Sequence, residues 1–320
     1  MRGVTHHPLR SLLAVPATSP RFLEKAASSE ADAIFIDLED AVIDDRKIES
    51  RKLAVEALNA LEWGNRLVLV RVNALATAWG CRDILDLVAA SPRLDGILLP
   101  KCDAAADVYT ASMIIGSAEL ETRRVQTVSL FALIETARGV ANVEAIAQFG
   151  GRLQALVFGG GDYQLDLGRF QQVVGAPSSD YVVVDEGAEG VQHWNDVWHF
   201  AMARVANAAR AYGLTAVDGP YSAIQDTEGL HWSGRRARAL GFEAKMAIHP
   251  QQLAIINGLM SPSAQQIAWA ENILSTMQAA AREGRGATRG PDGEMIDLMH
   301  VRLAKRIKAV SGKTSGGGAS

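Results

Sequence analysis

Short runs of apolar residues recur along the chain, and a stretch with helical periodicity follows each run. Apolar runs rich in β-branched side chains are typical of strands that are buried on both faces. Eight such runs predict strands at residues 12–16, 33–37, 66–72, 96–99, 128–134, 153–158, 214–217 and 244–248. Helices are predicted after them, at residues 20–28, 44–61, 81–89, 105–116, 140–149, 196–212, 227–240 and 263–282.

Eight strand–helix units in one unbroken series predict an α/β protein with a closed (β/α)8 TIM barrel. An open doubly wound sheet is the alternative. The predicted barrel domain covers residues 9–283. A Gly/Arg-rich linker leads to a C-terminal helical extension, or lid, over residues 284–310, with a helix at 299–310. The Gly/Ser-rich end, residues 311–320, is predicted to be disordered.

Composition argues against several classes of protein. The formal net charge is −4, so there is no basic field that would attract nucleic acid. No apolar run approaches the ~18 residues that cross a bilayer, and the N-terminus lacks the apolar core of a signal peptide. We therefore expect a soluble, cytoplasmic protein with no nucleic-acid or membrane partner.

Polar groups follow almost every predicted strand. Catalytic groups of a (β/α)8 barrel collect at the C-terminal ends of its strands, so these groups would meet at one mouth. Each carboxylate alone is often only a helix cap or an ion-pair partner, and the joint pattern therefore counts for more. The residues are Asp37, Glu39, Asp40, Arg71, Lys101, Glu135, Asp162, Asp218 and His249.

Glu135 and Asp162 are the best candidates for metal ligands. Glu135 ends an apolar strand, and Asp162 follows the three glycines 159–161, which let the backbone turn tightly and approach a ligand. We include Gly161 among the substrate-contacting positions for this reason. Two carboxylates on adjacent strands suit Mg²⁺, which takes hard oxygen ligands and keeps water sites open. The alternative is a pair of carboxylates neutralised by arginine.

Arg71 lies between two valines of a predicted strand, and an arginine in the interior needs an anion. Its planar guanidinium binds a substrate carboxylate in one interpretation, and neutralises Asp37 or Glu39 in the other. Asp37, Glu39 and Asp40 are also candidates to reach a metal through bound water. Asp40 is equally a candidate cap for the next helix.

The same segments resemble the citrate lyase β-subunit-like branch of the HpcH/HpaI aldolase family, over about residues 9–310. Each motif is short, but their ordered set is specific. The matching stretches are residues 10–16 (RSLLAVP), 36–42 (IDLEDAV), 70–73 (VRVN), 98–101 (LLPK), 133–136 (LIET), 157–162 (VFGGGD), 166–168 (DLG), 241–245 (GFEAK), 247–250 (AIHP) and 293–297 (GEMID).

The resemblance implies a (β/α)8 barrel, Mg²⁺ and lyase chemistry on malyl-CoA, citramalyl-CoA or citryl-CoA, which yields an acyl-CoA and a small 2-oxoacid. By motif position it makes Glu135 and Asp162 the metal ligands, and Arg71 the group that binds the oxoacid carboxylate or the developing oxyanion. It makes Asp297 an acid/base carried by the C-terminal segment, often onto a neighbouring subunit's site.

Further implications are contacts of Arg21 and Lys25 with the CoA phosphates, and a homotrimer or a hexamer built from trimers. Asp37 and Glu39 are counted with the catalytic groups. The chain departs from the pattern at residues 160–161, where relatives commonly carry a small polar residue. A long polar segment, residues 178–191, is expected to pass over the barrel mouth and puts the choice of acyl-CoA in doubt.

Three other functions fit parts of this pattern. A class II aldolase acting on free 2-oxoacids would share the barrel, the metal pair and the arginine, but would not need Arg21, Lys25 or Asp297. A thioesterase that hydrolyses malyl-CoA is a close variant. A non-catalytic binding or assembly subunit would be indicated by loss of the metal ligands, and both are present.

Overall fold

The computed structural model describes residues 9–178, 181–185, 191–194, 196–282, 284–289, 293 and 295–315. The chain divides into two compact units, Leu9–Asn257 and a second unit that begins at Gly258. The domain limits expected from the sequence, at residues 283 and 310, stay predictions. None of the described helices combines the length and the apolarity that crossing a membrane requires.

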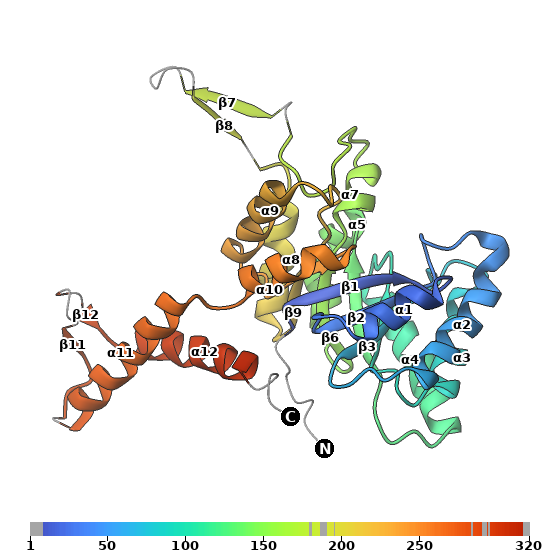
Figure 1. The fold of residues 1–320 in the computed structure, drawn as a ribbon, viewed down its shortest axis with the longest axis horizontal. Coiled ribbons are helices and arrows are strands. Elements are labelled where there is room, and N and C mark those ends of the chain that lie inside the picture. Colours follow the sequence, from blue (N-terminus) through green and yellow to red (C-terminus); the bar gives the residue numbers. More distant parts are fainter. Residues whose placement is uncertain are drawn as a thin grey trace. The chain divides into compact units, whose positions relative to one another are not determined.

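The first unit contains a closed barrel of eight parallel strands (Figure 1). Around the barrel the order is β1–β10–β9–β6–β5–β4–β3–β2, which confirms the predicted (β/α)8 architecture and all eight predicted strands. The strands are β1 (Ser11–Pro16), β2 (Ala33–Asp37), β3 (Leu67–Arg71), β4 (Gly96–Leu99), β5 (Ser129–Ile134), β6 (Leu153–Phe158), β9 (Thr215–Asp218) and β10 (Ala244–Ala247).

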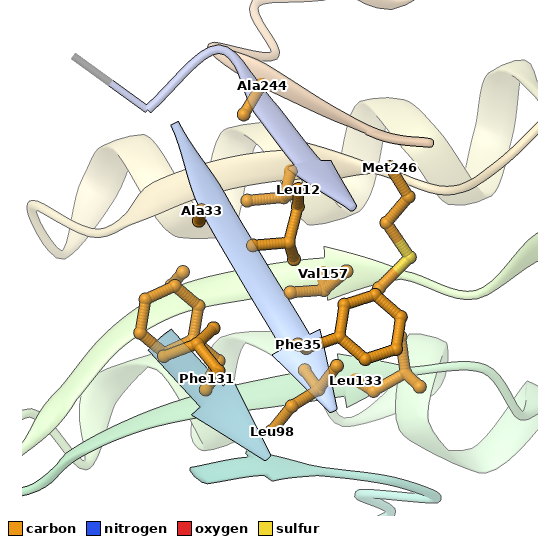
Figure 2. Packing of buried hydrophobic residues seen from close by; sticks show 12 residues of the cluster. Leu12, Ala33, Phe35, Leu98, Phe131, Leu133, Val157, Ala244 and Met246 are labelled. Atoms are coloured by element: carbon orange, nitrogen blue, oxygen red, sulfur yellow. The ribbon is translucent and has the colours of Figure 1, made fainter. Parts of the chain in front are cut away.

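Alternate positions of the strands fill the barrel interior. Figure 2 shows side chains from several strands converging there. The interior residues are Leu12, Ala33, Phe35, Leu69, Leu98, Phe131, Leu133, Ala155, Val157, Val217, Ala244 and Met246. Successive side chains of a strand point to opposite faces, so the next inward positions of β2, β3 and β5 are Asp37, Arg71 and Glu135. The apolar pattern thereby sets three polar groups at the C-terminal mouth.

Helices follow the strands broadly as predicted, with α1 (Pro20–Ala27), α2 (Lys47–Ala60), α3 (Gly80–Ala90), α4 (Ala105–Glu121), α8 (His199–Ala211) and α9 (Thr227–Ala239). The predicted helix at 140–149 is two helices, α5 (Ala137–Ala141) and α6 (Val143–Gln148). It begins early because the Thr136 side chain caps α5 by accepting a hydrogen bond from the backbone N–H of Gly139.

Some elements were not predicted, and three features are the most prominent. The first is α7 (Gly160–Asp166), which starts in the glycine run. The second is an antiparallel hairpin of β7 (Val182–Asp185) and β8 (Val191–Trp194), which begins in the segment 178–191 expected to pass over the barrel mouth and extends beyond it. The third is α10 (Leu253–Met260), whose almost continuous apolar sequence has no polar face to give a helical period.

The second unit is built on α11 (Ala264–Arg282) and α12 (Leu298–Ser315), the C-terminal helices (Figure 1). The two helices pack against each other around Ala270, Ile273, Met277, Ile296 and Ala304. A short antiparallel pair, β11 (Thr288–Arg289) and β12 (Met295–Ile296), joins them. The helix α12 extends to Ser315 and residues 316–320 lie outside the described part, so the expected disorder of residues 311–320 stays a prediction.

A buried ion pair fixes the outer side of β9 and β10. Lys245 is 1% exposed, and it points away from the barrel interior because its neighbours on β10 point inward. Its ammonium donates to Asp218 Oδ2 at 2.6 Å, to the Gly219 carbonyl at 2.8 Å and to Ser233 Oγ on α9 at 3.0 Å. All three ammonium protons have acceptors, so the pair ties α9 to the barrel.

We expect Asp218→Asn to destabilise the protein by about 3–5 kcal/mol, because it leaves a buried ammonium without its counter-charge. Urea unfolding followed by circular dichroism measures the change. The control is Glu49→Gln, which breaks the exposed pair between Arg46 and Glu49 and should leave the midpoint unchanged. Equal midpoints for the two variants would contradict this role for Lys245 and Asp218.

Candidate active site

The sequence-predicted groups Asp37, Arg71 and Glu135 lie together at the C-terminal mouth of the barrel. Asp37 and Arg71 end adjacent strands and are register partners across β2 and β3. Glu135 directly follows β5 and is 3% exposed. Asp162 stands in the first turn of α7, after β6, so adjacent strands deliver the two predicted metal ligands.

Arg71 is neutralised by three carboxylates of its own chain. It donates two hydrogen bonds to Asp37, from Nε to Oδ1 at 2.8 Å and from Nη2 to Oδ2 at 2.7 Å. Its Nη1 lies 2.9 Å from Asp40 Oδ2 and 3.2 Å from Glu39 Oε2. Of the two interpretations of Arg71, internal neutralisation is therefore present, and its role toward a substrate stays a prediction.

Asp37 is fully occupied in this arrangement. Besides the two bonds from Arg71, it accepts the backbone N–H groups of Glu39 at 2.9 Å and Ala41 at 3.2 Å. Burial alone would lower the pKa of Arg71, but the hydrogen bonds and charge of Asp37 outweigh that effect and raise the pKa. Arg71 therefore stays charged, and its two hydrogen bonds to Asp37 make a rigid support for one side of the mouth.

Glu39 is held through both its backbone and its side chain. The buried Lys47 ammonium donates to the backbone carbonyls of Leu38 at 3.0 Å and Glu39 at 2.7 Å, which fixes the turn after β2. In the Glu39 side chain, Oε1 accepts a hydrogen bond from Lys101 Nζ at 2.7 Å. Burial raises the pKa of Glu39, and the charges of Arg71 and Lys101 oppose this shift.

Lys101 is the residue of the site that the sequence did not single out. Its backbone N–H donates to Glu135 Oε1 at 2.8 Å, and its Nζ lies 3.0 Å from Asp162 Oδ2. It thus contacts Glu39, Glu135 and Asp162 at once. The sequence indicates Lys101 only as one polar group among several at strand ends. Its other signal, a left-handed backbone with φ of 48°, is visible only in the structure.

Glu135 is the carboxylate in the most unfavourable surroundings. Burial raises its pKa to about 8, the nearby charges of Glu39 and Asp162 add to this shift, and Lys101 opposes it. Gly159 makes room for it, because a Cβ added at Gly159 would lie 2.5 Å from Glu135 Cβ and 2.7 Å from its Oε2. No side chain fits at position 159 without displacing Glu135.

Asp162 is only loosely held. Its Oδ2 is buried, and its contact with Lys101 Nζ lacks hydrogen-bond geometry. Gly161, next to Asp162, was predicted to approach substrate. A Cβ added there would lie 3.7 Å from Val174 Cγ2, an ordinary contact distance. An unsatisfied buried carboxylate oxygen is costly, so Asp162 is poised to accept a further ligand.

The donor set fits a hard divalent cation. Five carboxylates, from Asp37, Glu39, Asp40, Glu135 and Asp162, share the mouth with two cationic groups, Arg71 and Lys101. Within the described residues no three carboxylate, imidazole or thiol groups form a ready-made metal cluster. Two carboxylates completed by water and substrate oxygens are nevertheless a common Mg²⁺ arrangement.

Three other predicted site residues belong to α1 and to the second unit. Arg21 and Lys25 are exposed on α1. Asp297 belongs to the second unit, where a hydrogen bond with His300 and one from the Met299 N–H lower its pKa. Asp297 is therefore ionised and able to accept a proton. The assigned roles of these three residues stay predictions.

Comparison with known proteins identifies the family of the chain. Residues 10–250 match the family HpcH/HpaI aldolase/citrate lyase. The chain belongs to this family. It is 38% identical over 301 residues to an L-malyl-CoA/beta-methylmalyl-CoA lyase of Cereibacter sphaeroides, which covers 94% of this chain and 93% of the relative. It is also 35% identical over 304 residues to a (3S)-malyl-CoA thioesterase of Cereibacter sphaeroides, which covers 95% and 94%.

A solved structure extends the comparison to ligands. The protein CitE from Mycobacterium tuberculosis, in complex with magnesium, acetoacetate and coenzyme A, is 29% identical, with a TM-score of 0.72. The alignment covers 94% of this chain and 97% of CitE. The citrate lyase β subunit of M. tuberculosis, complexed with oxaloacetate and magnesium, matches 79% of this chain at a TM-score of 0.62 and 29% identity.

We expect Gly159→Ala to weaken Mg²⁺ binding more than tenfold, because the new Cβ forces Glu135 out of its position. Titration calorimetry with MgCl₂ measures the affinity. Gly161→Ala is the matched control, since the same methyl group two residues away meets only ordinary van der Waals distances. Wild-type affinity in Gly159→Ala would show that Glu135 does not hold the cation.

The metal-free protein should lose stability as the pH rises. Glu135 keeps its proton in the folded chain up to about pH 8 but loses it near its ordinary pKa of 4.5 when unfolded. Folding therefore takes up a proton between these values, and this contribution is present below pH 4.5 and lost as the pH rises toward 8. Between pH 6 and 8 the loss should be about 2 kcal/mol.

Thermal unfolding in EDTA, repeated across this pH range, tests the expectation. Glu135→Gln cannot ionise, so the free energy of unfolding of this variant should rise relative to that of the wild type as the pH rises. Parallel profiles for the two proteins would mean that Glu135 ionises as freely in the fold as in water.

Proposed function

We propose that this chain is a Mg²⁺-dependent carbon–carbon lyase. Its substrate would be a 3-hydroxyacyl-CoA of the malyl-CoA type, including citramalyl-CoA and citryl-CoA, and its products an acyl-CoA and a small 2-oxoacid. The observation that carries the proposal is the pairing of Glu135 with Asp162 beside Arg71 at the barrel mouth. The named relatives support it, since two act on malyl-CoA and one holds magnesium with coenzyme A.

The chain's own groups divide the work. Glu135 and Asp162 would hold Mg²⁺, which acts as a Lewis acid on a carbonyl or alkoxide oxygen. Arg71, kept rigid by Asp37, would place a fixed positive charge beside the oxygen on which negative charge develops. Glu39 would orient this charge from the other side, at 3.2 Å from Nη1.

The remaining assignments concern groups outside the mouth. Asp297, ionised and half-exposed, would move the proton of the reacting carbon or hydroxyl. Arg21 and Lys25 would bind the CoA phosphates as exposed cations on α1. A homotrimer or hexamer in the cytoplasm is the expected form.

Hydrolysis of malyl-CoA is the second candidate, because a (3S)-malyl-CoA thioesterase is 35% identical over nearly the full length. The mouth groups would stabilise a developing oxyanion in either reaction. A class II aldolase that acts on free 2-oxoacids is less well supported, because the named relatives act on or bind CoA compounds. A non-catalytic subunit would have no need for the strained surroundings of Glu135.

A screen of purified chain against malyl-, β-methylmalyl-, citramalyl- and citryl-CoA, with and without Mg²⁺, tests the proposal. Lysis yields a 2-oxoacid and an intact acyl-CoA thioester, whereas hydrolysis yields free CoA thiol, so a hydrazine assay and a thiol reagent separate the two. We expect 2-oxoacid without thiol, only when Mg²⁺ is present.

Glu135→Gln and Asp162→Asn should each reduce the rate by about 10²–10³-fold, as is typical when one charge-stabilising group is lost. Glu144→Gln, an exposed carboxylate on α6, is the matched control and should keep the wild-type rate. Full lyase activity in either mouth variant would reject the metal assignment, and thiol release from malyl-CoA would favour the thioesterase.

A further inference from the structure

The Lys101 ammonium lies in the gap between two carboxylates of the mouth. Its Nζ is 2.7 Å from Glu39 Oε1 and 3.0 Å from Asp162 Oδ2. Asp162 Oδ2 is one of the oxygens that the proposed function offers to a cation, and it has no hydrogen-bond partner in the described part of the chain. The lysine therefore stands where positive charge is required.

The backbone at Lys101 is shaped for this position. A lysine with φ of 48° is in the left-handed region, a backbone conformation that residues other than glycine seldom adopt. In this conformation the backbone N–H donates to Glu135 Oε1 at 2.8 Å while the side chain extends toward Glu39 and Asp162. One residue thus contacts the two proposed metal ligands and the carboxylate beside them.

The two ends of this contact differ in strength. The bond to Glu39 has good geometry, whereas the approach to Asp162 does not qualify as a hydrogen bond. The Lys101 side chain is 40% exposed and ends a flexible four-carbon stem, so it has room to move away from Asp162. Arg71 lacks this freedom, because Asp37 holds it by two hydrogen bonds.

We propose that Lys101 is a built-in counter-ion of the metal site. In the metal-free chain its ammonium holds Glu39 and Asp162 together, and it must leave Asp162 when Mg²⁺ binds. The affinity for Mg²⁺ is then set by competition between the divalent cation and the lysine. This inference rests on the proposed function, since it takes Glu135 and Asp162 to be the ligands.

Competition follows from the charges. An ammonium and Mg²⁺ cannot both approach Asp162 Oδ2 closely, because like charges at about 4 Å repel strongly near a protein surface. Without any cation in the gap, the carboxylates of Glu39 and Asp162 would repel each other. Lys101 therefore stabilises the empty site and weakens the loaded one.

Lys101→Met tests this, because methionine removes the charge and keeps the backbone N–H that binds Glu135. We expect Mg²⁺ to bind the variant about tenfold or more tightly in titration calorimetry, since a repulsive charge is gone. In EDTA the variant should melt at a lower temperature than the wild type, and saturating Mg²⁺ should close most of that gap. Lys52→Met is the matched control, because it removes the same charge from an exposed site on α2.

A second measurement uses the wild-type protein and does not depend on the folding of a variant. Amine labelling followed by mass spectrometry reports the accessibility of Lys101, and saturating Mg²⁺ should increase its labelling several-fold. Lys52 serves as the internal reference and should not respond. In Asp162→Asn, which lacks a proposed ligand, Mg²⁺ should leave the labelling of Lys101 unchanged.

The outcomes separate this inference from the proposed function. Unchanged or weaker Mg²⁺ binding by Lys101→Met, with wild-type binding that still requires Glu135 and Asp162, would overturn the counter-ion role alone. Mg²⁺ binding that survives both Glu135→Gln and Asp162→Asn would overturn the metal site itself. Tighter binding by the variant together with metal-dependent labelling supports competition.

Discussion

Repulsion between carboxylates at the barrel mouth is the constraint on which the site depends. Asp37, Glu39, Asp40, Glu135 and Asp162 are gathered there, and the cations Arg71 and Lys101 oppose their charge. Burial makes the remaining negative charge unfavourable, and together with the charges of Glu39 and Asp162 it raises the pKa of Glu135 to about 8. The arrangement is stable when a proton or a cation supplies the missing positive charge.

The two halves of the mouth meet this constraint differently. On the β2–β3 side, Asp37 and Arg71 satisfy each other by two hydrogen bonds, and Asp37 accepts two more from the backbone. On the β5–β6 side, Glu135 accepts the backbone N–H of Lys101, and Asp162 Oδ2 lies near the Lys101 ammonium without a hydrogen bond. The β2–β3 side is therefore held in place by its own hydrogen bonds. In our proposal, the β5–β6 side exchanges the Lys101 ammonium for a divalent cation.

The strands and several mouth residues could be predicted from the sequence, because the side chains of a strand alternate between its two faces. Apolar runs identified all eight strands, and the period of two brought Asp37, Arg71 and Glu135 to one face. The partner of Arg71 could not be chosen, because it depends on the pairing of β2 with β3. Lys101 could be named only as one of several polar groups at strand ends, since its reach depends on a left-handed backbone, and α7 was missed since glycines disfavour helices.

The mouth groups of this chain do not by themselves distinguish lysis from hydrolysis. A lyase and a thioesterase are similar to this chain over nearly its full length, at 38% and 35% identity. Both reactions build negative charge on an oxygen, which Arg71 and a bound cation would stabilise alike. Lysis needs a group that moves a proton while water is excluded, and hydrolysis needs water admitted to the thioester. The decision therefore belongs to segments that control access to the mouth, and the mouth itself supplies the electrostatics that either reaction uses.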